Sequence, residues 1–294
     1  MFFKRNVAEI KTICIYHYNK FDYMPIIKDS TPCIYPAPDA VMVKYFDLTK
    51  FISMLQRRSL FFCRLDKLED RFEGTTSKPN LEYRYQVEKK ARLQMQSMKG
   101  YAKVETTDPN NEISIKQSVK DLYEYENYKK SITCINCWNN GSMESVALWK
   151  IYSDFGKGIM IKSEIKNIEK AFDNTNEIIR VSEITYIDFL NDLMPDYNLI
   201  YPFIHKDVSY TYENEIRLIY EVTRNDGGPH KWESEEVEEG KYLECDLNLL
   251  IKEIIIAPNA PTWYFSLILD LCIKYNLNKP VTNSRMGRKN PIEN

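Results

Sequence analysis

Glycine is scarce in this chain, with only 9 among 294 residues. Neither a P-loop nor a GxGxxG fingerprint occurs, which argues against a glycine-rich nucleotide-binding fold. The GxSxG turn that carries the nucleophilic serine of α/β-hydrolases is also missing. What the chain has instead is aromatic residues, which make up 13% of the sequence and include 21 tyrosines.

Long apolar runs are missing as well. No stretch approaches the roughly 20 residues that span a bilayer, and the N-terminus lacks the continuous apolar region of a signal peptide. The seven cysteines are an odd number scattered through the chain, which fits a reducing compartment better than a disulfide framework. The sequence therefore predicts a cytoplasmic protein without membrane contact.

Excess charge of one sign is absent too, since the net charge is only −2. Such a balance gives no global attraction to nucleic acid. The arginine pairs at 57–58 and 285–288 are the basic features that could touch phosphate, and a few surface arginines do not make a nucleic-acid site. We expect nucleic acid not to be the partner.

Metal-binding patterns are incomplete. Cys134 and Cys137 have the spacing of a zinc knuckle, but no second CxxC pair occurs. The three histidines are far apart in sequence, so they supply no second ligand pair. We interpret the two cysteines as buried structural residues and predict no metal site.

The order of the elements predicts an α+β fold with a curved, mostly antiparallel sheet and flanking helices, because short strands are irregularly spaced and helices cluster between them. Residues 1–42 are predicted to be a lead-in packed on the core, and 43–285 a single domain. A charged, helix-periodic stretch at about 78–130 is predicted to be a helical insertion. Residues 286–294 form a polar tail.

The stretch VSYTYENEIRLIYEV, at 208–222, reads as a strand. In a strand, Glu213, Glu215 and Arg217 share one face. One interpretation is a solvated face with glutamate–arginine pairs of little energetic weight. The other is a partly buried face on which two carboxylates raise each other's pKa and supply a general base or a cation-stabilising group.

Several blocks together resemble the bacterial domain-of-unknown-function family 2971: VKYFDL at 43–48, LFFCRLDKLEDRFEG at 60–74, the stretch 132–163, VSEITY at 181–186 and YENEIRLIY at 212–220. The chain departs from the family pattern at Arg71, Asn136 and Leu148. The residues that match it are Asp70, Phe72, Glu73, Trp149, Tyr152, Gly158, Glu213, Glu215 and Arg217. The family name implies a fold but no activity.

A fainter resemblance is to ADP-ribosyltransferases, through the order Arg64, then Asn136, then Glu213 and Glu215. It implies NAD as the co-substrate, Glu215 as the catalytic carboxylate with Glu213 as its partner, and a carboxylate that stabilises the ribose oxocarbenium ion. The remaining expected substrate contacts are Arg64 or Arg217 as the phosphate anchor, together with Asn136, Trp149, Tyr152 and Tyr212.

These resemblances lead to two hypotheses. The first is an NAD-using, ADP-ribosyltransferase-like or glycosidic-bond-cleaving enzyme that acts as a bacterial toxin or defence effector. The second is a non-catalytic sensor or interaction domain that binds a small anionic ligand or a protein in the same cleft. Geometry separates them, because the first requires Arg64, Asn136 and Glu215 to converge on one cavity.

Overall fold

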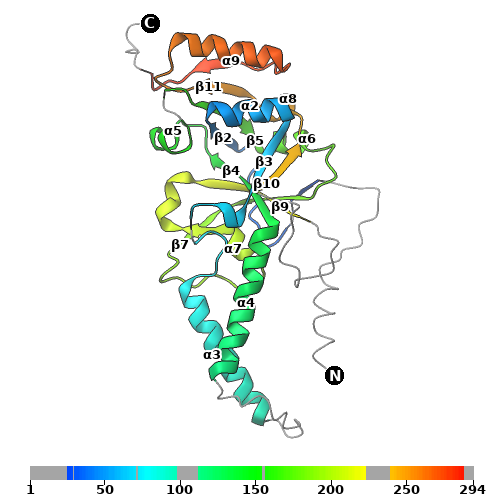
Figure 1. Ribbon diagram of the computed structural model, residues 1–294, viewed down its shortest axis with the longest axis vertical. Coiled ribbons are helices and arrows are strands. Elements are labelled where there is room, and N and C mark those ends of the chain that lie inside the picture. The colour runs from blue at the N-terminus through cyan, green and yellow to red at the C-terminus, as the bar shows by residue number, and fades with distance from the viewer. Residues whose placement is uncertain are drawn as a thin grey trace.

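The computed structural model describes residues 25–28, 30–70, 72–97, 112–153, 156–222 and 239–287. It confirms an α+β fold with a mixed, mostly antiparallel sheet that does not close, and with a helical insertion (Figure 1). Most of the predicted lead-in and tail lies outside the described residues.

Ten strands form the main sheet, in the order β1-β6-β9-β4-β2-β5-β11-β12, with β3 and β10 branching from β4. Among the strands that the structure describes in this sheet, only the β1–β6 and β11–β12 pairings are parallel. The strands are β1 (Ile26–Ile27), β2 (Val41–Phe46), β3 (Ser59–Arg64), β4 (Thr133–Asn140), β5 (Ile159–Glu164), β6 (Ile179–Glu183), β9 (Glu215–Glu221), β10 (Gly240–Glu244), β11 (Glu253–Ile256) and β12 (Val281–Asn283). A separate parallel pair joins β7 (Thr185–Ile187) to β8 (His205–Asp207).

The helices lie around this sheet and at one end of it (Figure 1). The α-helices are α2 (Leu48–Arg57), α3 (Lys78–Ser97), α4 (Glu112–Ile132), α5 (Val146–Tyr152), α6 (Ile165–Ala171), α7 (Tyr201–Ile204), α8 (Leu247–Leu250) and α9 (Thr262–Lys274), and the 3₁₀ helices are η1 (Leu65–Lys67) and η2 (Val208–Glu213).

Helix α2 shows how local sequence sets the element boundaries. The side chain of Asp47 accepts a hydrogen bond from the backbone N–H of Lys50 and so caps the start of the helix. Phe51 and Leu55, four residues apart, both lie buried on one side of the helix. Arg58 then adopts a left-handed conformation and ends the helix.

The central strand β9 is covered on both faces, because successive apolar side chains along it point into two different hydrophobic cores. Leu218 belongs to the large core that also contains residues of α2, α6 and α9. Ile219 points the other way, into a second core with Phe189 and Phe203. Glu215 and Arg217 therefore lie inside the protein, and of the charged residues of β9 only Glu221, at its end, is partly exposed.

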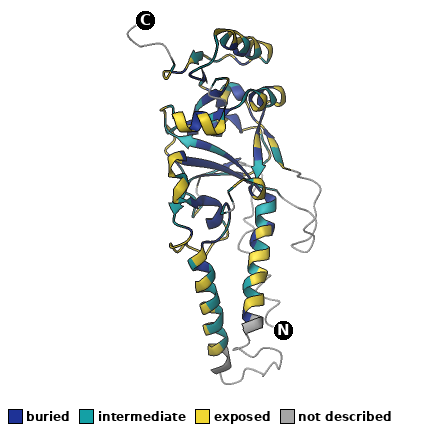
Figure 2. Ribbon diagram, turned by 60° about the vertical axis from the view of Figure 1, so that its left-hand side comes forward, coloured by how far each residue is buried: buried dark blue, intermediate teal, exposed yellow. Residues whose placement is uncertain are grey.

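Helices α3 and α4 form an arm that projects away from the sheet (Figure 1). This arm is the helical insertion predicted from sequence. Figure 2 shows that much of its surface is exposed or half-buried, unlike the central strands. Among the residues that the structure describes, no helix has both the length and the apolar character needed to cross a membrane.

Candidate functional site: a buried ion cluster beneath exposed tyrosines

Five charged side chains meet on the second-core face of the sheet, and we call them the ion cluster: Glu73, Lys206, Glu213, Glu215 and Arg217. They come from the turn after η1, from β8, from the end of η2 and from β9. None of the five is more than 8% exposed. Segments more than 140 residues apart in sequence thus share one ionic network.

Arg217 is the centre of the network and is completely buried. Its Nε lies 2.7 Å from Oε1 of Glu215, and its Nη2 lies 3.0 Å from Oε2 of the same carboxylate. Its Nη1 donates to Oε1 of Glu73 at 2.6 Å and to the carbonyl oxygen of Phe203 at 2.8 Å. The guanidinium therefore forms a bidentate pair with Glu215 through Nε and Nη2, and it binds the Glu73 carboxylate through Nη1.

Lys206 supplies the second positive charge. Its Nζ lies 2.6 Å from Oε2 of Glu213 and 3.2 Å from Oε2 of Glu215. Oε2 of Glu73 is 3.7 Å away, and the ring centroid of Tyr210 is 4.7 Å away, a cation–π distance. Lys206 thus holds Glu213 and Glu215 close together although their charges repel.

The pKa values of Glu73 and Glu215 are shifted in opposite directions. Burial raises the pKa of Glu73 by more than the neighbouring Arg217 lowers it. At Glu215, burial also acts to raise the pKa, but Arg217 and Lys206 outweigh it and bring the value to about 2. Burial lowers the pKa of Lys206, yet Glu215 and Glu73 together leave it above its usual range. Such a divergence between neighbouring carboxyls is typical of functional sites as well as of structural ion networks.

Glu213 connects the cluster to the surface. The hydroxyl of Tyr152 donates a hydrogen bond to Oε1 of Glu213. Tyr152 and Tyr212 are 43% and 45% exposed, whereas Glu213 is 6% exposed. Tyr210 lies beside Tyr212, with 6.2 Å between the ring centroids. The buried Glu213 thus contacts one half-exposed tyrosine, Tyr152, and directly follows a second, Tyr212, in the chain.

The backbone around Glu213 corrects the predicted strand. Residues 208–213 form η2, which Asp207 caps by accepting from the backbone N–H of Ser209 at 3.0 Å. Asn214 takes a left-handed conformation with φ 41°, and β9 begins only at Glu215. The predicted strand is wrong before Glu215, because the Asp207 cap and the left-handed Asn214 outweigh the β-propensity of the tyrosines. The two glutamates meet through a chain reversal and not through strand alternation.

The turn that carries Glu73 is built from the block matched by the family resemblance. Oδ1 of Asp70 accepts from the backbone N–H of Phe72 at 2.9 Å. The ring of Phe72 packs against Phe189, with 5.6 Å between centroids. Gly74 has φ +64°, a conformation that favours glycine. These features fix the backbone on both sides of Glu73 and aim its carboxylate at Arg217.

Arg64 and Asn136 lie on the opposite face of the sheet from the cluster. Arg64 stands across from Cys134, a residue of the large core, and Asn136 is two residues further along the same strand. Arg64 makes a bidentate pair with Asp66, with Nε···Oδ1 at 2.9 Å and Nη2···Oδ2 at 2.6 Å. The amide of Asn136 donates to the carbonyl oxygen of Phe61 at 2.7 Å. The convergence of Arg64, Asn136 and Glu215 that the first hypothesis requires is not present.

Trp149 and Gly158 make structural contacts away from the ion cluster. Trp149 is fully buried, its ring meets Tyr45 edge-on at 4.9 Å, and its Nε1 donates to Glu144 at 3.0 Å. The carbonyl oxygen of Gly158 accepts from Ala257 at 3.0 Å. Of the nine residues matched by the family resemblance, five come together here: Glu73, Tyr152, Glu213, Glu215 and Arg217.

Lys206 is the site residue that the sequence analysis missed. It lies in the three-residue strand β8, outside every block of the family resemblance. The signal that could have found it is charge balance, because two carboxylates and one arginine on a buried face leave a negative excess that a nearby cation must reduce.

The cysteines of the CxxC pair do not form a metal site with the described residues. Within those residues, no group of three or more histidine, cysteine, aspartate or glutamate side chains is placed to hold a metal ion. Cys134 is buried in the large core. Cys137 stands opposite Arg217 in the β4–β9 pairing, and burial raises the pKa of its thiol well above the usual value. A neutral, protonated thiol is a poor nucleophile and a poor metal ligand.

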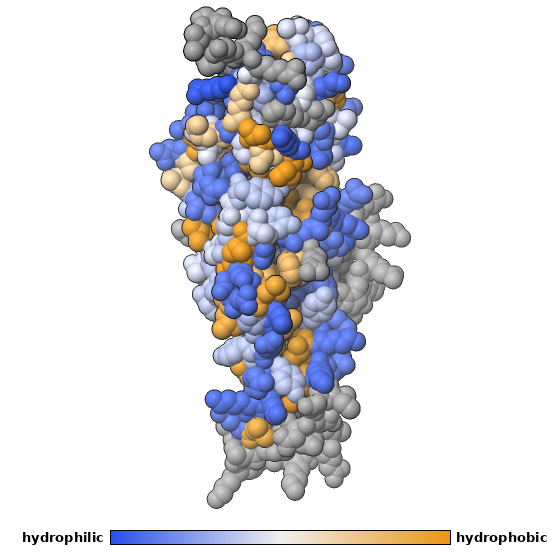
Figure 3. All heavy atoms as spheres, turned by 90° about the vertical axis from the view of Figure 1, so that its left-hand side faces the viewer, coloured by the Kyte–Doolittle hydropathy of each residue, from blue (hydrophilic) through white to orange (hydrophobic). Residues whose placement is uncertain are grey.

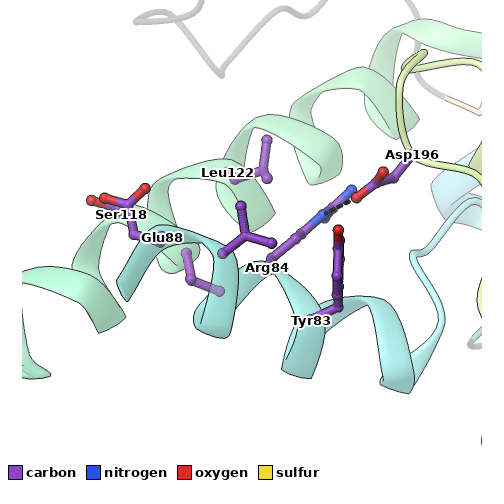
Figure 4. Close-up of a pocket in the computed structure, with 8 residues that line it drawn as sticks. Tyr83, Arg84, Glu88, Ser118, Leu122 and Asp196 are labelled. Atoms are coloured by element: carbon purple, nitrogen blue, oxygen red, sulfur yellow. Dashed lines mark hydrogen bonds and ion pairs between the residues drawn. The ribbon is translucent and has the colours of Figure 1, made fainter. Parts of the chain in front are cut away.

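A groove lies on the arm, away from the ion cluster. A groove of about 300 Å³ runs between α3 and α4, and Figure 4 shows Arg84 reaching across its end toward Asp196. Arg84 is already engaged, since Nη1 lies 2.7 Å from Oε1 of Glu126 and Nε lies 3.4 Å from Oδ2 of Asp196. The lining residues are Tyr83, Arg84, Val87, Glu88, Ser118, Val119, Leu122 and Asp196.

Comparison with protein-family models, with characterised proteins and with solved structures finds no match. The resemblance to the domain-of-unknown-function family 2971 therefore stays a prediction, carried by the residues quoted above.

Proposed function

We propose that this protein is an enzyme that cleaves a glycosidic bond, with NAD as its co-substrate, and that Glu213 is the carboxylate facing the substrate. The observation that supports this assignment is the hydrogen bond between Glu213 and Tyr152. Tyr152 is half-exposed, so this bond links the buried ion cluster to the protein surface. Glu215 is held by Arg217 and Lys206 beneath it and acts as a positioning residue.

The charge of the cluster suits this reaction. Three carboxylates and two cations leave one negative charge when all are ionised. When the bond between ribose and nicotinamide breaks, its electron pair leaves with nicotinamide and positive charge develops on the ribose, where water or an acceptor then attacks. A fixed carboxylate in a partly desolvated site stabilises that charge without reorganisation.

The tyrosines supply binding surface for such a substrate. Tyr152 contacts Glu213, Tyr210 contacts Lys206 and Tyr212 packs beside Tyr210, and aromatic rings stack on planar heteroaromatic groups such as nicotinamide. Arg217 is fully buried, so phosphate anchoring is better assigned to a residue other than Arg217. This changes the role that the sequence analysis gave it.

We place this activity in the cytoplasm of a bacterium, in a toxin or defence effector. The described cysteines support a reducing compartment, because Cys33, Cys63, Cys134, Cys137, Cys245 and Cys272 are all unpaired thiols. The bacterial setting follows the resemblance to family 2971.

The test is NAD consumption by the purified protein, alone and with cell lysate as a source of acceptor. Glu213→Gln keeps the size of the side chain and removes its charge, and we expect it to lower the rate by about 100-fold, the scale of losing one electrostatic contact in a transition state. Glu177→Gln is the matched control, since Glu177 pairs with Lys241 at the surface. Absence of turnover in the parent, or equal rates in parent and Glu213→Gln, contradicts the proposal.

The second candidate is a non-catalytic domain that binds a protein. The observation that favours it is that every charge of the cluster has a partner inside the cluster, while an open groove lies on the arm. Titration calorimetry with NAD distinguishes the two candidates, because the enzymatic proposal predicts binding that Glu213→Gln weakens and the second predicts no heat.

A further inference from the structure

An apolar patch lies where α3 meets the loop at 188–199. Six large side chains there are between 43% and 82% exposed: Tyr83, Val87, Leu190, Leu193, Tyr197 and Leu199. Figure 3 views the molecule from the side on which α3 lies, and hydrophobic side chains are interspersed there with hydrophilic ones. Single exposed apolar residues are ordinary, whereas six on one helix and the loop joined to it are more than a scattered residue or two.

The loop is held in place, so the exposure does not come from a loosely attached segment. Ser77 donates to the carbonyl oxygen of Asp192 at 2.8 Å, and Asn80 donates to the carbonyl oxygen of Met194 at 2.6 Å. Arg84 of α3 adds the contact to Asp196 at the groove. The helix and the loop therefore present one continuous surface.

The two halves of this surface carry opposite charge. Helix α3 has five lysines and arginines and two glutamates, a balance of +3, although the whole chain is −2. The loop at 188–199 has three aspartates and no lysine or arginine, a balance of −3. A surface that is basic at one end and acidic at the other is complementary to itself under a two-fold rotation.

We propose that this surface is an interface between two copies of the chain, in which α3 of one copy lies on the 188–199 loop of the other. The groove between α3 and α4 then receives an apolar side chain of the opposing loop, such as Leu193. A helix of 20 residues is about 30 Å long and 10 Å wide. With a loop of similar footprint, each copy covers about 600 Å², and the total of about 1,200 Å² is at the lower end of stable interfaces.

The experiment is sedimentation velocity over about 1–100 μM protein, with the parent and three single variants. Val87→Glu and Leu193→Glu place a charge in each half of the patch, and we expect each to weaken dimerisation at least tenfold. Trp263→Glu is the matched control, because Trp263 is 55% exposed on α9, at the far end of the molecule from the arm. Circular dichroism establishes that all variants are folded.

The charge argument adds a second readout. Raising the salt concentration from 50 to 500 mM is expected to weaken the parent dimer, because complementary surface charges are screened. A parent that stays monomeric at 100 μM in low salt overturns the proposal, and so does a dimer that Val87→Glu and Leu193→Glu leave intact. Either result leaves the enzymatic proposal standing, since NAD consumption is measured separately.

Discussion

At the scale of single residues, Arg217 is the side chain on which the cluster depends. It pairs with Glu215 and Glu73, and all three side chains are buried. Removing one partner of a buried pair leaves an uncompensated charge, which is far more costly than losing a surface pair.

We therefore predict that Arg217→Met lowers the free energy of unfolding by about 3–5 kcal/mol in urea denaturation. Arg64→Met is the comparison, because the pair of Arg64 with Asp66 is more exposed and surface pairs contribute about 0–1 kcal/mol. Equal decreases in the free energy of unfolding for the two variants would contradict the prediction that an unpaired charge in the buried cluster is the more destabilising.

The low pKa of Glu215 gives a pH signature. Its folded value of about 2 lies below the ordinary value of 4.5, so the ionised group stabilises the fold fully above pH 4.5 and loses that contribution as the pH falls toward 2. Glu215→Gln is therefore expected to destabilise the protein strongly at pH 6 and progressively less below pH 4.5. Urea denaturation of parent and variant between pH 6 and 2.5 measures this, and a difference that stays constant over the range contradicts the assignment.

At the scale of elements, the junction between η2 and β9 decides where the carboxylates point. Sequence patterning identified β9 itself, because apolar residues alternate along it from Ile216 onward. It could not place the start of the strand, since tyrosines and threonine at 210–212 favour a strand locally while the cap at Asp207 favours a turn. Lys206 escaped prediction for a related reason, as a three-residue strand has no periodicity to detect.

Asn214 tests this junction. We predict that Asn214→Val costs about 1–2 kcal/mol more than Asn214→Gly, because a β-branched residue is strained in the left-handed region and glycine is not. Both variants lose the side-chain hydrogen bond to the carbonyl oxygen of Asn140. The difference in stability between them therefore reports the backbone conformation at position 214. Thermal denaturation of the pair provides the measurement, and equal stabilities would argue against a left-handed residue between the glutamates.

At the scale of the whole molecule, the described residues form three hydrophobic cores and a helical arm, with the paired strands β4 and β9 at the centre of the sheet. The sequence was sufficient for the fold class and for the helical insertion, because helical and strand periodicities differ over long segments. It was not sufficient for the site, because Glu73, Lys206 and Arg217 meet through tertiary packing that no local pattern records. The same limit explains why Arg64 and Asn136, correctly ordered along the chain, lie on the other face of the sheet.

The measurement that tests the account most directly is a crystal structure of the protein with an NAD analogue whose carbocyclic ring prevents cleavage. We predict the ring that replaces ribose within hydrogen-bond distance of Glu213, with Tyr152 moved from that carboxylate and the nicotinamide against a tyrosine ring. An analogue bound between α3 and α4, or none bound at millimolar concentration, would contradict the claim that the ion cluster is the active site.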